Sequence, residues 1–435
     1  MVSTFKKGTK KETTNEVKKQ ESTTFLAKMG LVANKPDNCR TPSPNNDQPV
    51  NEDDLKTVKQ PGAVSPHANV LNNEPTSVKA KDPKAQPAVP ALNDGSLKGN
   101  SATVPNITTL SQSEKWAAEA TARDWLEKVD FSKAKLEFEK LQMMTVNVDT
   151  ECKKWKDNIK LSQSDHYPAL DSNLVAFEKV FVNISHVEVP LQRNLLIGQI
   201  PVTGNEEAFW KVVFGKCVTS MHVIFDQEPI HFFPVRSGDH IYHKTMFVHN
   251  RRVESVNEDV HRFSIEVLPE GCSNSIICNV TVVKNWKMGS VHTKQAVVIK
   301  EAIELINFTG NKAKDESALV LSTHGAGRAV YFVALSVAVY KLDLKSEPSI
   351  FDIVKSLRAQ RPKAIESLTQ YASLYISMFY YIKRKSSKMG DDKKVASDPH
   401  NPLCIRSVQL TNIFTNALIA EANAACSSTT TMLTK

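Results

Sequence analysis

The spacing of apolar residues divides the chain into three regions, two with helical spacing and one with strand-like runs between them. Residues 113–129 (SEKWAAEATARDWLEKV) and 133–144 (KAKLEFEKLQMM) have apolar positions three and four apart, which predicts two helices, the first with Ser113 as its N-cap. Short β-rich runs alternate with turns from about residue 165 to residue 300, and the clearest are VFVNISHVEV, KCVTSMHVIF, HRFSIEVL and IICNVTVVKNW. From residue 294 the spacing is helical again, in KQAVVIKEAIELINF.

One strand, SALVLS, and a glycine turn interrupt this helical region. Three further helices follow: AVYFVALSVAVYKLD, SIFDIVKSLRAQ and LTQYASLYISMFYYIKR. Strands flanked by helices over about 270 residues predict one α/β domain rather than two, which we place at residues 112–385. In schemes that separate the two classes, the domain would count as α+β.

Composition sets the N-terminal region apart from this domain. Residues 1–111 hold 11 of the 21 prolines and only two aromatic residues, Phe5 and Phe25. Such a segment cannot bury enough apolar surface to offset the entropy of ordering, so a disordered, basic and proline-rich tail is predicted.

The C-terminal region, residues 386–435, starts basic and polar and then offers a possible amphipathic helix over 408–424. An apolar stripe at helical spacing is formed by Leu410, Ile413, Phe414, Ala417 and Leu418. Such a stripe most often packs on its own domain, and a partner-binding helix is the alternative.

Charge and cysteine content narrow the class of protein. The net charge of +8 is spread over 435 residues without an aromatic-interleaved basic stripe, so nucleic-acid binding is disfavoured, and a basic surface suits an acidic, phosphorylated partner. Seven scattered cysteines without CxxC spacing argue against a disulfide framework and a zinc site. No apolar run reaches the roughly 18 residues of a membrane span, and no secretory signal is visible, so a cytoplasmic location is expected.

The stretch LVLSTHGAGRAVYFVAL predicts a strand, a tight glycine turn and a helix. Such a turn directs several backbone N–H groups at one point, where the helix dipole also favours an anion. Glycine permits the unusual backbone angles, and arginine offers a bidentate grip on phosphate oxygens. We therefore expect a phosphate-binding site formed by Thr323, His324, Gly325, Ala326, Gly327 and Arg328. The plain alternative is a tight connection whose arginine pairs with a carboxylate.

These residues resemble the signature loop of phosphotyrosine-specific protein phosphatases, V-H-C-S-A-G-x-G-R-[ST]-G. The segments VKSLRAQRPKAIESLTQYASLY and GQIPVTGNEEAFWKVVF are similar to further family motifs, and the resemblance covers about residues 112–385. It implies a single domain of that family, with a twisted mixed β-sheet flanked by helices and a strand–phosphate loop–helix at the site. The long lysine-rich tail before such a domain resembles the expanded phosphatase set of nematodes.

The family mechanism, as the resemblance implies it, needs residues that this chain lacks. Ser322 stands at the position of the nucleophilic cysteine, and a hydroxyl does not ionise as a thiol does beside an arginine and a helix N-terminus. In NWKMG, Trp286 is retained but Met288 replaces the general acid, aspartate. Glu366 matches the water-positioning glutamine, and Gln370 matches the second glutamine of the family. The tyrosine that sets pocket depth aligns loosely with residues 161–164 (LSQS), which would leave the aromatic wall missing.

Two other kinds of chemistry are weighed and disfavoured. Ser322 and His324 suggest an acyl hydrolase, but residues two apart in a tight loop rarely face each other, and no carboxylate is placed to orient the imidazole. The histidines of HIYH at 240–243 suggest a metal site, but residues three apart on a strand face opposite sides. No metal or cofactor is expected.

Three functions remain open at this point. The first is a catalytically inactive pseudophosphatase that binds phosphotyrosine or another phosphorylated protein in signalling. The second is a vestigial pocket in a protein that acts as a scaffold through its surface or tails. The third is a weakly active tyrosine phosphatase, so the sequence leaves catalysis uncertain and says nothing about oligomeric state.

Overall fold

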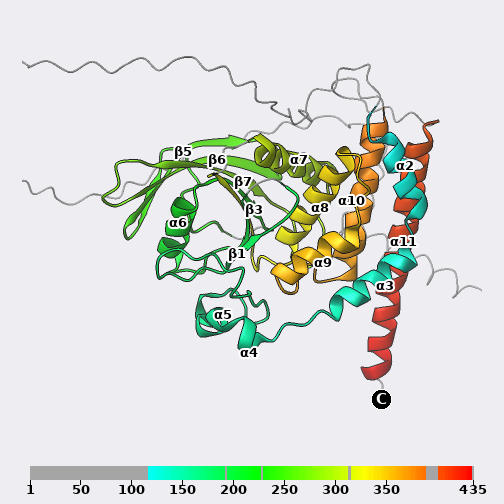
Figure 1. Ribbon diagram of the computed structural model, residues 1–435, viewed down its shortest axis with the longest axis horizontal. Coiled ribbons are helices and arrows are strands. Elements are labelled where there is room, and N and C mark those ends of the chain that lie inside the picture. Colours follow the sequence, from blue (N-terminus) through cyan, green and yellow to red (C-terminus); the bar gives the residue numbers. More distant parts are fainter. Residues whose placement is uncertain (1–115, 192–193, 227–228, 312–314, 388–399, 434–435) are drawn as a thin grey trace, which may run out of the picture. The chain divides into compact units, whose positions relative to one another are not determined.

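The computed structural model describes residues 116–191, 194–226, 229–311, 315–387 and 400–433 (Figure 1). The predictions for the tail at residues 1–111 and for an N-cap at Ser113 lie outside these described residues. The first described helix, α2 (Glu119–Lys128), begins after Ala118 and has no side-chain cap.

The centre of the domain is an eight-stranded sheet with the strand order β1-β2-β8-β3-β7-β6-β5-β4. Its strands are β1 (Ile184–Val187), β2 (Leu195–Gln199), β3 (Val218–Ile224), β4 (His240–His243), β5 (Met246–Ser255), β6 (Val260–Pro269), β7 (Ile276–Val283) and β8 (Ser317–Ser322). The four strands β2, β8, β3 and β7 run parallel, and the remaining pairings are antiparallel. The predicted α/β fold with a mixed sheet is therefore confirmed.

Helices cover both faces of this sheet (Figure 1). They are α2, α3 (Phe131–Gln142), α4 (Val148–Glu151), α5 (Lys153–Asp157), the 3-10 turn Ile159–Leu161, α6 (Glu206–Gly215), α7 (Gln295–Asn311), α8 (Arg328–Asp343), α9 (Ile350–Gln360), α10 (Leu368–Ser386) and α11 (Pro402–Leu433). Because successive strand residues point to opposite faces, Leu319 and Leu321 join the core under α6, while Ala318 and Val320 join the core under α8.

The central helix, α8, is apolar around its whole circumference, and its residues up to Tyr340 are all buried. A helix with this pattern must be enclosed on every side. The sheet, α7, α9 and α10 supply that enclosure. As a result, the N-terminus of α8 is held rigidly at the carboxyl end of β8, where the glycine turn lies.

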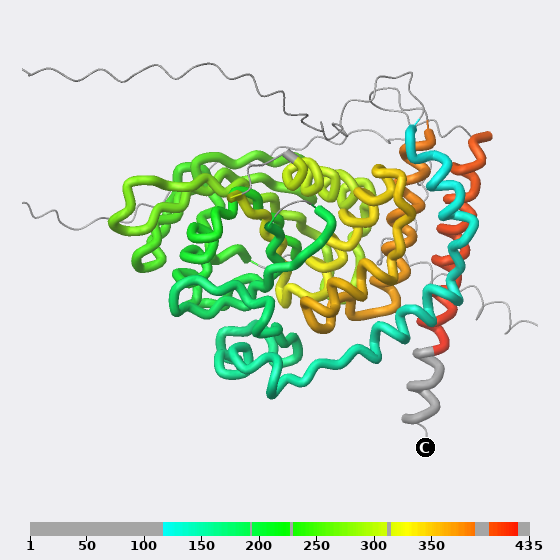
Figure 2. Tube along the Cα trace, in the orientation of Figure 1, coloured from blue at the N-terminus to red at the C-terminus, as the bar shows by residue number. Residues whose placement is uncertain are grey.

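The C-terminal helix α11 lies beside α2 and α3, as the red and cyan segments of Figure 2 show, and all three pack near α10. Leu410, Phe414 and Leu418 are buried there, and the ring of Phe414 lies 5.3 Å from that of Phe131. Ile413 is 49 % exposed. Most of the apolar stripe thus packs on the same domain.

Candidate phosphate-binding site

The glycine turn lies at the centre of the sheet, between the carboxyl end of β8 and the first residue of α8. Ser322 ends β8 in register with Gln199 of β2 on one side and Ile224 of β3 on the other. Helix α8 has Gly327 at its N-cap and no side-chain cap, whereas α9 and α10 are capped by Ser349 and Ser367. The first backbone N–H groups of α8 are therefore left available for another acceptor. We call residues 322–328 the cradle.

Gly325 makes the tight turn possible. Its φ of +66° lies in the left-handed region, and a Cβ placed on it would lie 2.4 Å from the carbonyl carbon of Gly198. The cradle therefore packs directly against the backbone of β2, in contact that only glycine permits. The unusual backbone angle expected of this glycine is therefore present, and its part in phosphate binding stays a prediction.

Arg361, at the end of α9, orients the peptides of the cradle. Its guanidinium is fully buried and donates to the carbonyl oxygens of Gly325 (3.2 Å) and His324 (3.1 Å) and to the Ser185 hydroxyl (3.0 Å). Burial lowers the pKa of Arg361 to about 10, so the group stays charged at neutral pH. The Ile365 N–H donates to the Ala326 carbonyl at 3.2 Å.

Three successive carbonyls, those of residues 324–326, therefore point away from the centre of the cradle into the protein. The N–H of the next residue in each peptide points the opposite way. Those N–H groups belong to residues 325–327, and the Ser322 hydroxyl accepts the Gly325 N–H at 3.1 Å. Among the described residues, the N–H groups of Ala326 and Gly327 have no acceptor. The sequence predicts the family motif that contains Arg361, but only the structure shows that Arg361 contacts the carbonyls of the cradle.

Arg328 connects the cradle to the segment around Trp286. Its guanidinium, only 3 % exposed, donates to the Trp286 carbonyl at 2.5 Å and to the Thr323 hydroxyl at 2.6 Å. We call residues 285–294 the Trp286 loop. The arginine that was expected to hold phosphate holds this loop against the cradle.

The Trp286 loop is closed on itself at its tip. Trp286 is fully buried, and its indole N–H donates to the Ser290 carbonyl at 3.0 Å. Gly289 has a φ of +71°, which allows the tight turn. Met288, at the position expected for a general acid, is 58 % exposed. A thioether has no proton to donate, so this residue cannot protonate a leaving group.

Glu366 and Gln370 lean over Gly327 at the other side of the cradle. A Cβ on Gly327 would lie 2.5 Å from Glu366 Oε1 and 3.1 Å from Gln370 Nε2. Burial raises the pKa of the Glu366 carboxyl above its usual 4.5, although a hydrogen bond from Tyr167 and the charge of Arg328 act in the other direction. Gln370 is fully buried and accepts the Glu366 N–H at 3.0 Å, and its Nε2 has no partner among the described residues.

An aromatic ring borders the cradle at a position that the sequence interpretation missed. Tyr167 stacks on His324 with ring centroids 4.4 Å apart and an interplanar angle of 14°. Burial and the neighbouring Glu366 raise the pKa of Tyr167 to about 12. Residues 161–164, which were aligned with the family's pocket tyrosine, contain no aromatic residue, and Tyr167 follows three positions later. A cavity of about 260 Å³ adjoins this ring and is lined by Gln142, His166, Tyr167, Arg358, Lys363 and Glu366.

His324 faces this ring rather than Ser322. No hydrogen bond joins the two side chains in the described part of the chain, and the Ser322 hydroxyl accepts the Gly325 N–H instead. Burial, followed by the charges of Arg328 and His166, lowers the pKa of His324 below its usual 6.5. An imidazole held in this way is not placed to deprotonate the serine, which argues against acyl hydrolysis.

The expected site residues are thus brought together around one point, apart from Met288, which is exposed on the Trp286 loop. Sequence comparison decides the family. The family pattern described as protein-tyrosine phosphatase matches residues 158–380. The chain belongs to the protein-tyrosine phosphatase family.

Two relatives within this phosphatase family come from Caenorhabditis elegans and are named as tyrosine-protein phosphatases. One, B0280.11, is 26% identical over 254 residues, which are 54% of this chain and 57% of the relative. The other, C15H7.3, is 24% identical over 258 residues, which are 56% of this chain and 62% of the relative. The chain therefore spans somewhat more than half the length of each relative.

A solved tyrosine phosphatase structure shows the same fold. PTPN18 in complex with HER2-pY1196 phosphopeptides superposes with a TM-score of 0.52 at 16% identity, covering 60% of this chain and 98% of that one. In the part of the phosphatase chain that the structure describes, no helix is long and apolar enough to cross a membrane. Within the same ranges, no group of three or more His, Cys, Asp or Glu side chains could hold a metal ion.

Proposed function

We propose that this phosphatase-family chain binds a phosphorylated protein through phosphotyrosine and does not hydrolyse it. The observation that carries the proposal is the orientation of the cradle peptides. Arg361 and Ile365 bind three successive carbonyls, so the N–H groups of residues 325–327 face the opposite side, at the N-terminus of α8. Convergent N–H groups at a helix N-terminus bind phosphate oxygens well.

A buried donor beside the cradle supports an anionic ligand. The Gln370 Nε2 is fully buried, has no partner among the described residues, and lies next to Gly327. A buried amide donor without an acceptor costs about 1–3 kcal/mol, which an incoming phosphate oxygen would recover. PTPN18, which shares the fold, has been solved with phosphopeptides bound.

Binding without turnover follows from the atoms at positions 322 and 288. The Ser322 hydroxyl is neutral at physiological pH, so it cannot attack phosphorus as a thiolate would. Met288 lacks an acidic proton. The loss of a general acid alone costs about 10²–10⁴-fold in rate. A phosphorylated partner would be held and then released unchanged.

Glu366 favours the vestigial alternative, in which the pocket no longer binds and the protein acts through its surface. An ionised carboxylate next to Gly327 would repel a phosphate dianion. The pKa of Glu366 is raised by its burial, however, so the carboxyl takes up a proton more easily when an anion enters. We therefore infer weakened rather than abolished binding.

The first experiment measures binding of a fluorescent phosphotyrosine peptide by anisotropy, with the unphosphorylated peptide as reference. Wild-type protein should bind only the phosphorylated form. Arg328→Met should weaken binding by about 10- to 100-fold, because a charge-assisted hydrogen bond is worth about 1.5–3 kcal/mol. Arg252→Met, which changes an exposed arginine on β5, is the matched control and should bind as wild type. Equal binding by all three proteins, or by none, would leave only the vestigial interpretation.

The second experiment measures phosphate release from the same peptide. The wild type should show none above the Ser322→Ala background. Ser322→Cys alone should stay slow, and Ser322→Cys with Met288→Asp should be faster by about 10²–10⁴-fold, because only the double variant can protonate the tyrosine oxygen. Catalytic release by the wild type that disappears in Ser322→Ala would show that the chain is an active phosphatase.

A further inference from the structure

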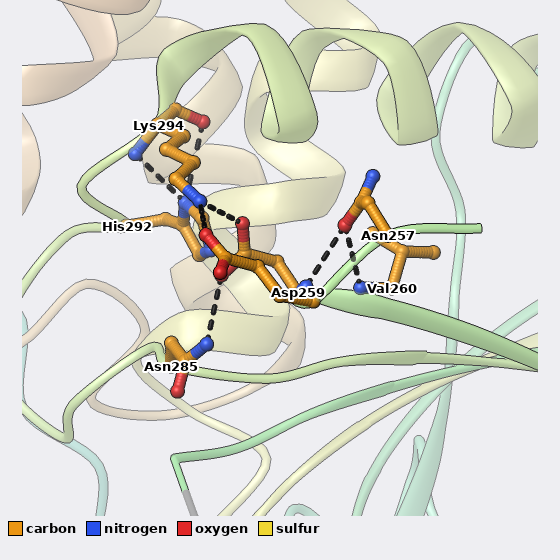
Figure 3. Close-up of polar contacts among 7 residues, drawn as sticks. Asn257, Asp259, Val260, Asn285, His292 and Lys294 are labelled. Carbon is orange, nitrogen blue, oxygen red and sulfur yellow. Dashed lines mark hydrogen bonds and ion pairs between the residues drawn. The ribbon is translucent and has the colours of Figure 1, made fainter. Parts of the chain in front are cut away.

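The segment next to the cradle is held by an acidic residue that the sequence did not single out. Asp259 precedes β6 and is 3 % exposed, although it is a carboxylate. Figure 3 shows it between the two ends of the Trp286 loop, below Lys294 and above Asn285. Carboxylates are rarely this buried unless they are paired.

Each carboxylate oxygen of Asp259 binds a different end of the Trp286 loop. Oδ1 accepts from the Asn285 side-chain amide at 2.8 Å, and Oδ2 accepts from the Lys294 ammonium at 2.7 Å (Figure 3). The Asp259 carbonyl also accepts the Lys284 N–H at 2.8 Å. One residue of the β5–β6 turn therefore fixes both the start and the end of the loop.

We call the contacts of Asp259 with Asn285 and Lys294 the clamp, and neighbouring residues hold it in place. The Asn257 side chain accepts the N–H groups of Asp259 at 2.8 Å and Val260 at 3.0 Å, which fixes the turn that carries the carboxylate (Figure 3). At the other end, His292 Nδ1 accepts the Lys294 N–H at 2.9 Å. His292 is fully buried and lies edge-to-face against the Trp286 ring. The lysine is therefore placed by the loop as well as by its charge.

Asp259 is charged at neutral pH. Burial by itself would raise the pKa of this carboxyl, but hydrogen bonds from Lys294 and Asn285 and the nearby positive charges outweigh burial and hold the pKa below its usual 3.8. Lys294 also pairs with Glu258, an exposed residue whose side chain is 74% accessible. Pairs with exposed partners contribute little, whereas removal of one partner from a buried pair is costly.

We propose that Asp259 is a positioning residue that keeps the Trp286 loop closed against the cradle in the absence of a ligand. With both ends of the loop fixed, the Trp286 carbonyl stays where Arg328 donates to it, and the arginine is held in one orientation. The cradle is thereby organised before an anion arrives, which lowers the entropic cost of binding. The last step rests on the proposed function, but the clamp does not.

The clamp is tested on the full-length, ligand-free chain by hydrogen exchange of the Trp286 loop amides. Asp259→Asn and Lys294→Met should each speed exchange in residues 285–294 by about tenfold or more, which corresponds to about 1.4 kcal/mol, while exchange in α10 stays unchanged. Glu258→Gln removes only the exposed partner of the same lysine and should exchange as wild type. Lys294→Arg keeps the charge and should retain slow exchange.

The same variants are then measured with the phosphotyrosine peptide. If the wild type binds, Asp259→Asn and Lys294→Met should raise the Kd by about tenfold, in line with the more open loop. If the wild type does not bind, the proposed function fails, and the exchange measurement still decides the clamp. Because Lys294 is half exposed, its replacement gives a folded protein even if Asp259→Asn does not fold. Loop exchange that is the same in Lys294→Met, Glu258→Gln and wild type would overturn the proposal.

Discussion

Replacement of Gly325 by alanine tests how closely the cradle is packed against the sheet. The new methyl group would lie 2.4 Å from the carbonyl carbon of Gly198, 2.5 Å from its oxygen and 2.8 Å from the Gln199 nitrogen. All three atoms belong to the β2 backbone, which is paired with β1 and β8 and cannot turn aside as a side chain could.

Two costs combine at this position. The backbone angle φ of +66° places alanine in the left-handed region, which costs about 1–2 kcal/mol. Overpacking against fixed neighbours adds about 1–3 kcal/mol. The expected loss in the free energy of unfolding is therefore about 2–5 kcal/mol.

Gly271→Ala is the matched control because it carries the first cost without the second. Gly271 has a φ of +77°, and nothing lies within 4 Å of a Cβ built on it. The expected loss there is about 1–2 kcal/mol. The entropy that alanine removes from the unfolded chain is the same at both positions, so it cancels in the comparison.

The assay is urea unfolding of both variants and the wild type, followed by circular dichroism. The difference between the two variants should be about 1–3 kcal/mol, with Gly325→Ala the less stable. Variants that differ by less than about 0.5 kcal/mol would refute the close packing of the cradle on β2.

Three further predictions concern buried or half-buried ionisable groups. Arg361→Lys should lower the free energy of unfolding by about 2–4 kcal/mol, because an ammonium cannot reach all three acceptors of the guanidinium. A loss below about 1 kcal/mol in urea unfolding would contradict the role of Arg361 in the cradle. Glu366→Gln should bind sulfate about tenfold more tightly than the wild type at neutral pH, as measured by calorimetry. Because burial raises the pKa of Glu366, the wild-type carboxyl becomes neutral as the pH falls towards 4.5, and the advantage of the variant should fade. A ratio of the two affinities that stays constant with pH would contradict this prediction. His222 is buried on β3, where burial and the charge of Arg262 lower its pKa to about 4. The stability that depends on the neutral ring is therefore present above pH 6.5 and is lost as the pH falls towards 4. His222→Leu should remove up to about 3 kcal/mol of this loss at acid pH, and an unchanged slope of stability against pH would contradict the prediction.

Much of the fold could be read from local patterns. The predicted helices at 133–144, 329–343, 349–360 and 368–384 correspond to α3, α8, α9 and α10, and the four clearest β-rich runs correspond to β1, β3, β6 and β7. Periodicity reports these elements because each has one or two buried faces. Strands β2 and β5 are less visible: β2 contains a glycine, and the second half of β5 is charged and exposed at the side of the sheet.

Part of the chemistry at the site could also be predicted from the sequence. Ser322 has a hydroxyl and Met288 a thioether in any fold. The reasons to doubt catalytic turnover therefore depend only on which residues occupy these two positions. The sequence pattern of a strand, a glycine turn and a helix likewise places the N–H groups of residues 325–327 near a helix N-terminus, because the conformation of a turn depends on neighbouring residues.

Other features were decided only by tertiary structure. Arg361 reaches the cradle across 36 residues of sequence, Tyr167 stacks on His324 from a different part of the chain, and Asp259 binds both ends of the Trp286 loop. Sequence spacing governs contacts within a helical turn or between neighbours on a strand, whereas these meetings depend on strand order and on how helices pack on the sheet. The sequence by itself determined which atoms this phosphatase-family site has, and the packed sheet and helices decided which of them meet.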